Sequence, residues 1–316
     1  MRHPKYRIGL VDSVHHSCRE GLEAAGFEVV EIHHLNDNDT RKAIRNVDGI
    51  VVRSRFPFDR QFMQENQHLQ CIGRWGSGLE NIDLDAAADH GIAVVNAPEG
   101  NRQAVAEHAL LLLLSLLRYM PRIDQDVRRG VWKREANRGV ELSGKTVGII
   151  GYGNTGSAFA KVLSGFDVEI LAYDKYRSGF SDDIVQEVPL NDVLQRADIV
   201  SLHLPQTAET KHYVNEEWLS MLQKPIYLLN TARGNLIEPN TLLNALERKQ
   251  IIGAGLDVLP FESSSFERVD HSARLESFLK HPNIVFSPHI AGWTHEANKK
   301  MAHWLVKRMT SVLKNK

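Results

Sequence analysis

Short apolar runs alternate with amphipathic stretches along this chain, and this alternation constrains the possible fold more than any other feature. Five strand-like runs occupy the first third of the sequence: "YRIGLVD", "FEVVEI", "GIVVRS", "LQCIGRW" and "IAVVNA". Six more follow from Lys145: "KTVGIIG", "VEILAYD", "ADIVSLHLP", "PIYLLNTA", "IIGAGLDV" and "NIVFSPH". Strands that alternate with helices form parallel sheets covered by helices on both faces. The pattern therefore predicts an α/β protein with two doubly wound parallel-sheet domains.

A glycine-rich turn, "GYGNTG", opens the second series. It supplies Gly151, Gly153 and Gly156 directly after an apolar strand, and we expect the following helix to begin at Ser157. Glycines at a strand-to-helix turn let the backbone approach a pyrophosphate, whose charge the helix N-terminus stabilises. The motif predicts a dinucleotide site; the alternative is a plain glycine turn.

The next strand of this series ends at Asp174. A carboxylate at that position can accept hydrogen bonds from the adenosine ribose hydroxyls, and it would repel a 2'-phosphate. The cofactor is therefore predicted to be NAD rather than NADP. Lys175 and Arg177 lie close by and weaken that preference.

A long helical stretch, from about Gln103 to Arg129, separates the two series. It is apolar nearly all round from Ala109 to Leu117, which predicts packing between two bodies, and it is too short to span a bilayer. The last amphipathic segment, roughly Thr294 to Leu313, has no third series to join, so we expect it to return to the first domain. The expected organisation is a substrate-binding domain of residues 1–98 and 290–316, interrupted by an NAD-binding Rossmann domain of residues 99–289.

Composition excludes several classes of partner. The formal net charge of -1 over 316 residues, with no run of Lys or Arg, gives no reason to expect nucleic acid or an anionic membrane. Cys18 and Cys71 show no disulfide or metal-ligand spacing, which favours a reducing cytoplasm and no metal. The start "MRHPKYRIGLVD" has no apolar core of a secretory signal, so none is expected.

Three ionisable residues follow strand candidates of the second series: Arg233 after "YLLNTA", Glu262 beyond "GAGLDV" and His289 after "IVFSP". The carboxyl ends of parallel strands meet where ligands bind. A histidine with a carboxylate partner suits general acid-base work, and an arginine can grip a carboxylate and polarise a carbonyl. With a nicotinamide, the set predicts hydride transfer on a 2-hydroxy or 2-keto acid. Alternatively, Arg233 and Glu262 pair structurally and His289 packs in a core.

These residues lie in motifs through which the chain resembles the D-isomer-specific 2-hydroxyacid dehydrogenase family over nearly its whole length. The motifs are "GRWGSGLENID", "NAPEGN", "GIIGYGNTG", "HLPQTAET", "NTARG", "GAGLDVLPFE" and "SPHIAGWTHEA". The resemblance implies a Rossmann domain inserted into a flavodoxin-like domain, with Arg233, Glu262 and His289 as catalytic residues. It also implies a homodimer in which about Met120 to Glu141 embraces the partner.

The resemblance extends to the binding residues. Asp257 would meet the nicotinamide amide, and Ser77 and Gly78 would offer N–H groups to the substrate carboxylate. The implied cofactor-binding residues are Gly151, Gly153, Asn154, Thr155, Gly156, Asp174, His203, Pro205, Thr210, Thr231, Ala232, Asp257 and Gly292. The chain departs from the family pattern in having Ser263 where proline follows the glutamate, and in carrying Trp75 and Trp293 near the expected pocket.

Extra arginines bear on the substrate. Arg53 ends "GIVVRS" and Arg74 ends "QCIGRW", with Arg55 close behind. One carboxylate does not need so many cations, whereas a substrate with an added phosphate would. Within the family the chain is most similar to D-3-phosphoglycerate dehydrogenases, which implies oxidation of D-3-phosphoglycerate to 3-phosphohydroxypyruvate in serine biosynthesis. The substrate site would comprise Arg53, Ser54, Arg74, Ser77 and Gly78.

Other readings stay open at this point. Arg53 and Arg74 could instead pair with Asp59, Glu80 or Asp83, and Arg134 and Arg138 could reach a phosphate across a dimer or lie in a solvated loop. A glyoxylate, hydroxypyruvate or other 2-keto acid reductase would use the same catalytic residues. A corepressor-like NAD-sensing scaffold is a remote alternative. A C-terminal regulatory domain, as in some phosphoglycerate dehydrogenases, is not expected.

Overall fold

The computed structural model describes residues 6–262, 269 and 273–314. These residues form two compact units. The first comprises residues 6–102 and 293–314, and the second comprises residues 103–262, 269 and 273–292. Each unit has its own parallel sheet.

The sheet of the first unit has the strand order β2-β1-β3-β4-β5, and every neighbouring pair is parallel. This is the flavodoxin-like order. Its elements are β1 (Arg7–Leu10), α1 (His16–Ala24), β2 (Glu28–Glu31), α2 (Asp37–Ile44), β3 (Gly49–Val52), α3 (Arg60–Glu65), β4 (Cys71–Arg74), α4 (Leu84–Asp89), β5 (Ala93–Asn96) and α12 (His295–Lys314). All five strands that the apolar runs predicted are present.

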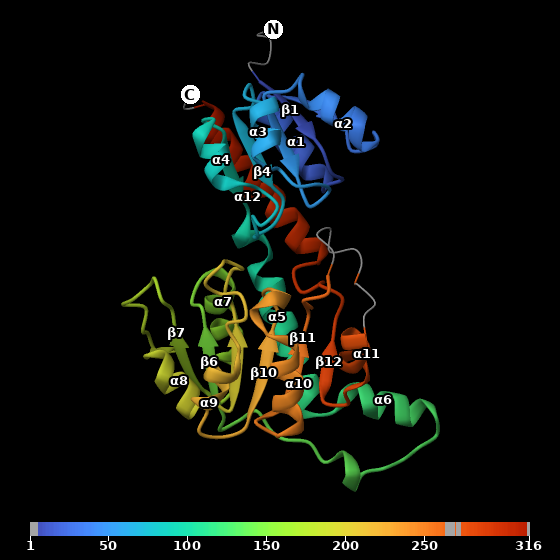
Figure 1. Cartoon of the computed structure of the whole chain (residues 1–316), viewed down its shortest axis with the longest axis vertical. Coiled ribbons are helices and arrows are strands. Elements are labelled where there is room, and N and C mark those ends of the chain that lie inside the picture. Colours follow the sequence, from blue (N-terminus) through green and yellow to red (C-terminus); the bar gives the residue numbers. More distant parts are fainter. Residues whose placement is uncertain (1–5, 263–268, 270–272, 315–316) are drawn as a thin grey trace. The chain divides into compact units, whose positions relative to one another are not determined.

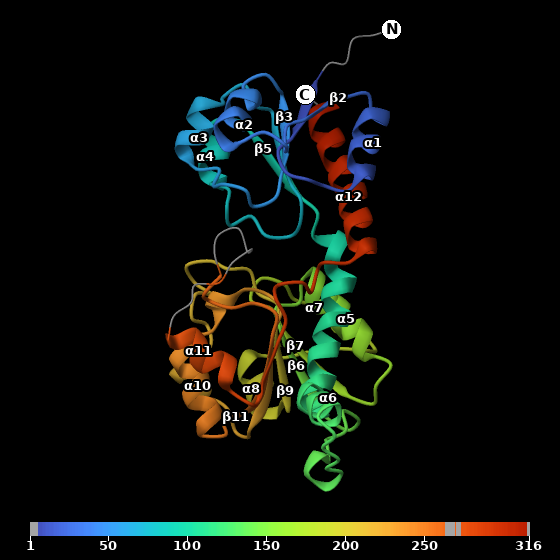
Figure 2. The same cartoon turned by 90° about the vertical axis from the view of Figure 1, so that its right-hand side faces the viewer.

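Helices cover both faces of this first sheet. On one face, α2, α3 and α4 bury Ile44, Phe62 and Ala86 against Ile50 of β3. On the other, α1 and α12 pack on residues such as Val51. Figure 2 shows the strands between these two helical layers. Adjacent residues of β3 face opposite layers because side chains alternate along a strand, so a run buried on both faces is continuously apolar.

The sheet of the second unit is parallel, in the order β12-β11-β10-β9-β6-β7-β8. The strands β8-β7-β6-β9-β10-β11 have the Rossmann order 3-2-1-4-5-6, and β12 is added beside β11. Its elements are β6 (Thr146–Ile150), α7 (Asn154–Leu163), β7 (Glu169–Tyr173), β8 (Gln186–Glu187), α8 (Leu190–Arg196), β9 (Ile199–Leu202), α9 (Glu216–Ser220), β10 (Ile226–Asn230), η2 (Gly234–Leu236), α10 (Pro239–Glu247), β11 (Ile251–Leu256), α11 (Ala273–Lys280) and β12 (Ile284–Phe286). The six predicted strands are present, and β8 was missed because two residues carry no periodicity.

This second sheet is also covered on both faces (Figure 1). Helices α8, α9, α10 and α11 pack on residues such as Leu228 of β10. Helix α7 and the C-terminal part of α5 (Pro98–Leu117) pack on residues such as Leu229. The sequence predicted that the stretch from Ala109 to Leu117, apolar nearly all round, packs between two bodies, yet Leu111 is 56% exposed. That expectation is therefore wrong for one side of α5.

A break separates α5 from α6 (Met120–Arg128), where the sequence predicted one continuous helix to Arg129. The prediction was wrong: the two helices are bent by 63°, and Tyr119 adopts the left-handed conformation, with φ 54°. Pro121 is tolerated in the first turn of α6, whereas in a continued helix its ring would clash with the carbonyl of Leu117. That carbonyl instead accepts a hydrogen bond of 2.9 Å from the N–H of Val140.

Among the described residues, no single helix is long and apolar enough to cross a membrane; α5 and α6 would reach that length and apolarity only as a bent pair. Most of the polar segment "ESSSFERVDHSARLE", which the sequence predicted to be a loop with a helical turn, lies outside the described residues. Its C-terminal end begins α11.

Candidate active site

The glycine-rich turn joins β6 to α7 and leaves no room for side chains at two positions. Gly151 has φ +94°, and a Cβ there would lie 2.6 Å from the carbonyl oxygen of His203. A Cβ on Gly156 would lie 2.1 Å from the carbonyl oxygen of Gly151. Helix α7 begins at Asn154, not at Ser157 as expected, because Gly156 belongs to its first turn, where only a glycine fits against the turn.

The N-terminus of α7 has no side-chain cap among the described residues. Gly153 is its N-cap residue, no side chain caps the helix there, and a Cβ on Gly153 would meet nothing within 4 Å. The first N–H groups of a helix have no partner within the helix, so an uncapped start is suited to an anion. Asn154 and Thr155, two of the expected cofactor contacts, are the first residues of this helix.

Asp174 follows β7 and organises the loop around it. Its Oδ2 accepts a hydrogen bond of 2.8 Å from the N–H of Tyr152, next to Gly151. Its Oδ1 accepts hydrogen bonds from the N–H groups of Tyr176 and Arg177, at 2.9 and 3.0 Å. The carboxylate therefore ties the end of β7 to the glycine turn.

His203, expected to contact the cofactor, follows β9 and has a buried side chain. Its Nε2 lies 2.9 Å from Oγ of Ser201, and its Nδ1 lies 3.1 Å from Oγ1 of Thr155. Burial lowers the pKa of His203 from about 6.5 to about 3, so the ring is neutral and one nitrogen donates while the other accepts. The His203 side chain therefore supports the start of α7 through its contact with Thr155.

The loop after His203 folds on itself. The hydroxyl of Thr210 donates to the carbonyl of Pro205 at 2.6 Å and accepts from the N–H of Thr207 at 2.8 Å. Both Pro205 and Thr210, expected at the cofactor, thus lie in one compact turn on the carboxyl side of β9.

Arg233 is held in place by a buried asparagine at the end of β10. Asn230 accepts a hydrogen bond of 3.0 Å from the N–H of Ala232 and donates one of 2.8 Å to the carbonyl of Arg233, bridging the turn. The Arg233 guanidinium itself donates to the carbonyl of Ala232 at 2.6 Å. Thr231, which lies between Asn230 and Ala232 in the sequence, has a buried hydroxyl with no hydrogen-bond partner among the described atoms.

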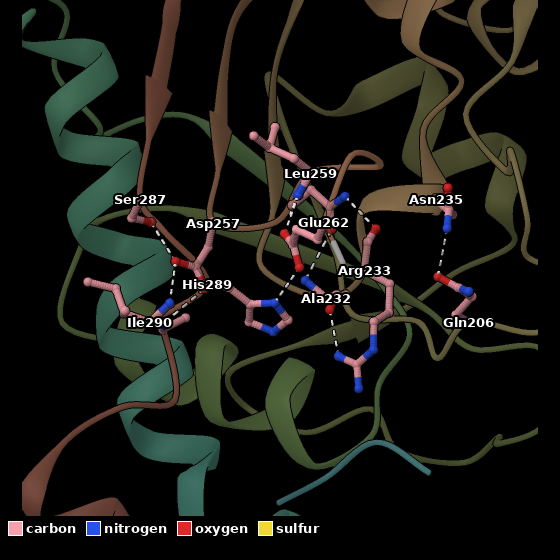
Figure 3. A network of polar contacts seen from close by, with 12 residues as sticks. Gln206, Ala232, Arg233, Asn235, Asp257, Leu259, Glu262, Ser287, His289 and Ile290 are labelled. Atoms are coloured by element: carbon pink, nitrogen blue, oxygen red, sulfur yellow. Dashed lines mark hydrogen bonds and ion pairs between the residues drawn. The ribbon is translucent and has the colours of Figure 1, made fainter. Parts of the chain in front are cut away.

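Glu262 and His289 form a direct pair. Nδ1 of His289 lies 2.6 Å from Oε2 of Glu262, and Oε1 of Glu262 accepts a hydrogen bond of 2.5 Å from the N–H of Leu259. Figure 3 shows the His289 ring and the Arg233 guanidinium extending beyond the strand ends toward the same side of the view. The structure thus brings all three expected catalytic residues to one edge of one sheet.

Asp257 positions the segment that carries His289. The residue is 1% exposed, and its carboxylate accepts hydrogen bonds from the N–H groups of Ile290 and Ala291, at 2.9 and 2.8 Å, and from the Ser287 hydroxyl, at 2.6 Å. Its carbonyl accepts from the N–H of His289 at 2.7 Å, which helps hold that residue at φ 55°. Gly292, one of the expected cofactor contacts, follows Ala291 directly in the sequence. Asp257, which is expected at the nicotinamide, thus holds this segment in place, and its Oδ1 also lies 3.5 Å from Nε2 of His108.

The expected substrate residues lie in the first unit. Arg53 follows β3, and its N–H donates to Oδ2 of Asp12 at 2.5 Å. The Arg53 guanidinium stacks over the ring of Trp293, 4.5 Å from its centroid. Burial raises the pKa of Asp12, while the N–H of Arg53 and the charges of Arg53, Arg55 and Arg74 act in the opposite direction. The Asp12 carboxylate thus contacts Arg53 and is influenced by the charges of Arg55 and Arg74.

The other arginines are partly committed to the fold. Arg55 forms an ion pair of 2.8 Å with Asp37 and donates to the carbonyls of Val11, His33 and Leu35. The guanidinium of Arg74 donates to the carbonyl of Trp75 at 2.5 Å. The sequence left open that Arg53 and Arg74 pair with Asp59 or Asp83. The carboxylates of Asp59 and Asp83 accept hydrogen bonds from backbone N–H groups of α3 and α4.

The loop after β4 carries Ser77 and Gly78. The Ser77 hydroxyl contacts the side-chain oxygen of Asn101 at 2.8 Å, and its carbonyl accepts from the Asn96 amide at 2.6 Å. Ser54 lies in the bend after β3. Trp75 is buried and donates to Asn298 at 3.3 Å, so it is a core residue of the first unit. Among the described residues, no group of three or more His, Cys, Asp or Glu could hold a metal ion.

Residues 110–291 match the family model described as D-isomer specific 2-hydroxyacid dehydrogenase, NAD binding domain. The chain belongs to this family. The matched part is the second unit almost in full, which is where the glycine turn, Arg233, Glu262 and His289 lie.

Known members of the family resemble the chain over nearly all of its length. A hydroxypyruvate reductase of Thermotoga maritima is 33% identical over 96% of this chain and 97% of its own. A D-3-phosphoglycerate dehydrogenase of Bacillus subtilis is 32% identical over 94% of this chain, which spans 55% of that protein's length. The solved structure of a glyoxylate reductase from Paecilomyes thermophila has a TM-score of 0.86 at 26% identity, covering 99% of this chain and 97% of that one.

Three supporting residues of this site were not found by sequence reasoning: Asp12, Asn230 and Ser287. Asn230 alone had a local signal, since an asparagine at the end of a buried strand commonly bridges the following turn. Ser287 was quoted only as part of a motif, and its contact with Asp257 spans 30 residues. Asp12 meets Arg53 across 41 residues.

Proposed function

We propose that this chain catalyses the NAD-dependent interconversion of a D-2-hydroxy acid and its 2-keto acid. The observation that carries the proposal is the contact of 2.6 Å between His289 and Glu262, in the same unit as Arg233 and the glycine turn. Membership of the family supports it independently. The pair provides an acid-base group, and the arginine provides a carboxylate clamp.

The second unit fits NAD on three observations. The glycine turn excludes side chains at Gly151 and Gly156, α7 starts without a side-chain cap, and the buried Thr231 hydroxyl has no partner among the described atoms. We propose that Gly151 to Gly156 hold the pyrophosphate, that Asp174 meets the adenosine ribose, and that residues around Pro205, Thr231 and Gly292 line the rest. When bound, NAD supplies the hydride acceptor, and NADH the donor.

His289 would move the proton. The Glu262 carboxylate can only accept a hydrogen bond, so Nδ1 of His289 carries a hydrogen and Nε2 exchanges the proton with the substrate oxygen. In oxidation Nε2 takes the hydroxyl proton; in reduction it returns one to the carbonyl oxygen. Glu262 stabilises the imidazolium formed in between, and Arg233 binds the substrate carboxylate and polarises the reacting carbonyl.

We propose D-3-phosphoglycerate as the substrate, oxidised to 3-phosphohydroxypyruvate. Arg53 and Arg74 follow neighbouring strands of the first unit, with their charges close enough to bear on the same carboxylate, Asp12. Two guanidiniums that act on one anion suit a phosphate. Several phosphoglycerate dehydrogenases are among the relatives, although the chain spans about half the length of the curated ones it matches.

A second candidate is reduction of hydroxypyruvate or glyoxylate. Two observations favour it: Asp12 offsets part of the arginine charge, and the similar hydroxypyruvate reductase has nearly the same length as this chain. Both candidates share the proposed roles of Arg233, Glu262 and His289. Of their 2-keto acids, 3-phosphohydroxypyruvate and hydroxypyruvate differ only in the distal phosphate.

A substrate panel tests the proposed function. The purified chain would be assayed with NADH against 3-phosphohydroxypyruvate, hydroxypyruvate, glyoxylate and pyruvate, and with NAD against D-3-phosphoglycerate and its L isomer. We expect turnover of D-acids only, with the highest kcat/KM for the phosphorylated pair. Highest efficiency with hydroxypyruvate would select the second candidate. Binding of NADH without turnover of any acid would contradict an enzymatic role and favour a scaffold.

We also propose a homodimer in the cytoplasm. From α6 through residue 141, the chain extends away from the rest of the second unit in both views (Figures 1 and 2). Large apolar side chains are exposed there and on α5: Leu111, Met120, Val127 and Trp132, the last at 78%. Such side chains gathered on one segment commonly mark a protein interface. The location is supported by Cys18 and Cys71, which are buried free thiols.

A further inference from the structure

A carboxylate outside the expected cofactor residues, that of Glu209, lies beside the loop that should bind the adenosine ribose. Glu209 lies in the loop after β9, and its Oε1 forms an ion pair with the ammonium of Lys175, directly after Asp174. Its Oε2 accepts a hydrogen bond of 2.7 Å from the hydroxyl of Tyr176. The Lys175 ammonium also lies 5.6 Å from the centroid of the Tyr176 ring.

The order of the strands shows where the contact between Glu209 and Lys175 lies. Strands β9 and β7 lie on either side of β6, and the glycine turn leaves the carboxyl end of β6. Glu209 follows β9, while Lys175 and Tyr176 follow β7, so their contact bridges the loops that flank the glycine turn. The turn formed by Thr207 and Thr210 fixes the Glu209 loop through hydrogen bonds of 2.8 and 3.2 Å.

Two cations follow Asp174, and both are engaged. Lys175 is bound by Glu209, and Nη1 of Arg177 donates to the carbonyl of Tyr152 at 2.5 Å. A 2'-phosphate on the adenosine ribose needs a cation near the end of the second Rossmann strand. While Glu209 binds Lys175, the carboxylate offsets the charge of the ammonium, and Glu209 adds a second negative charge to that of Asp174.

We propose that Glu209 is a specificity-determining residue, which keeps Lys175 from binding a 2'-phosphate and so makes the site selective for NADH over NADPH. This inference rests on the proposed function and names a residue that sets the cofactor preference of the same site. The ion pair is exposed, so its strength is modest. The selectivity it adds should therefore be a few-fold and come on top of the effect of Asp174.

Direct binding tests the proposal without relying on turnover. Dissociation constants for NADH and NADPH would be measured by nucleotide fluorescence for the wild-type chain, Glu209→Gln, Lys175→Met and the double variant. Glu169→Gln is the matched control, since Glu169 forms an exposed ion pair with Arg196 at the other end of β7. We expect Glu209→Gln to tighten NADPH binding about two- to fivefold, the range of one exposed ion pair, with little change for NADH.

The double variant shows whether the gain in NADPH affinity depends on Lys175. If Lys175 supplies the gain, Lys175→Met should cancel it in the double variant, and Glu169→Gln should change neither affinity. Unchanged NADPH affinity in Glu209→Gln would overturn the proposal, as would an equal gain in the double variant, which would assign the effect to repulsion by Glu209 alone. Absence of NADH binding in the wild-type chain would overturn the proposed function and this inference with it. That result differs from the two outcomes above, in which the wild-type chain binds NADH.

Discussion

Nδ1 of His289 lies 2.6 Å from Oε2 of Glu262, although 27 residues separate the two along the chain. The pairing depends on two separate supports. Asp257 fixes the segment around His289 through the N–H groups of Ile290 and Ala291, and the N–H of Leu259 fixes Glu262. A carboxylate held this firmly can stabilise the imidazolium that would form when His289 takes a proton from the substrate.

Replacing Glu262 by Gln tests that role. The variant keeps the size of the side chain and removes the charge that stabilises the imidazolium formed during oxidation of the hydroxy acid, so kcat should fall. The loss should be smaller than that of a His289 variant, with the affinity for NADH unchanged, and steady-state rates and NADH titration measure both. A kcat equal to that of wild type would show that the two side chains are not coupled.

Replacing His289 by Ala should abolish most turnover and spare cofactor binding. Loss of a general acid-base group typically lowers the rate by about 10² to 10⁴, while the glycine turn and Asp174 remain intact. Stopped-flow or steady-state rates and NADH titration together check this. Weakened NADH binding of similar size would assign His289 a structural role instead.

The buried His203 should make stability depend on pH. Its folded pKa is about 3, against about 6.5 for a free histidine, so below pH 6.5 the unfolded chain takes up a proton that the folded chain does not. Stability is unaffected above pH 6.5 and falls as the pH drops toward 3, by about 2 kcal/mol at pH 5. Urea unfolding of wild type and His203→Gln at pH 7 and pH 5 measures the difference.

A control separates this effect from general acid denaturation. His34 is exposed, so His34→Gln should retain the wild-type change between pH 7 and pH 5, whereas His203→Gln should show a smaller one. The same change in all three proteins would mean that His203 is not the group responsible.

Sequence patterns predicted the strand ends well because a buried parallel strand is a continuous apolar run with a sharp polar end. Arg233 and His289 were located in this way, after "YLLN" and "IVFSP". The supporting contacts had no such signal. Asp12 meets Arg53 because β1 pairs with β3 in the register Leu10↔Val51, which brings the residues two positions further on side by side. Register between distant strands depends on packing, which no local pattern records.

Asp12 offers a test of the charge around the arginines. Asp12→Asn keeps the size of the side chain, can still accept from the N–H of Arg53, and removes a negative charge close to Arg53, Arg55 and Arg74. If these arginines bind a phosphate, the KM for 3-phosphohydroxypyruvate should fall relative to that for hydroxypyruvate. A ratio of the two KM values equal to that of wild type would indicate that no phosphate is bound there.

The arginines themselves separate the two candidate substrates, because 3-phosphohydroxypyruvate and hydroxypyruvate differ only by the phosphate. Arg53→Ala or Arg74→Ala should lower kcat/KM for the phosphorylated acid by about 1.5 to 3 kcal/mol of transition-state binding, the range for a lost charge-assisted bond. The loss for hydroxypyruvate should be much smaller. Arg60→Ala, which removes an exposed arginine paired with Asp89, should affect neither acid.

Arg233→Ala should instead impair both acids to a similar extent, since the carboxylate that Arg233 is proposed to bind is common to them and its polarising effect acts in the transition state. Measuring kcat/KM for both acids in wild type and the four variants gives the full comparison. Equal losses for the two acids in the Arg53 and Arg74 variants would falsify the phosphate assignment. The remaining interpretation would be a 2-hydroxyacid dehydrogenase in which Arg53 stacks on Trp293, and in which the charges of Arg53 and Arg74 only offset that of Asp12.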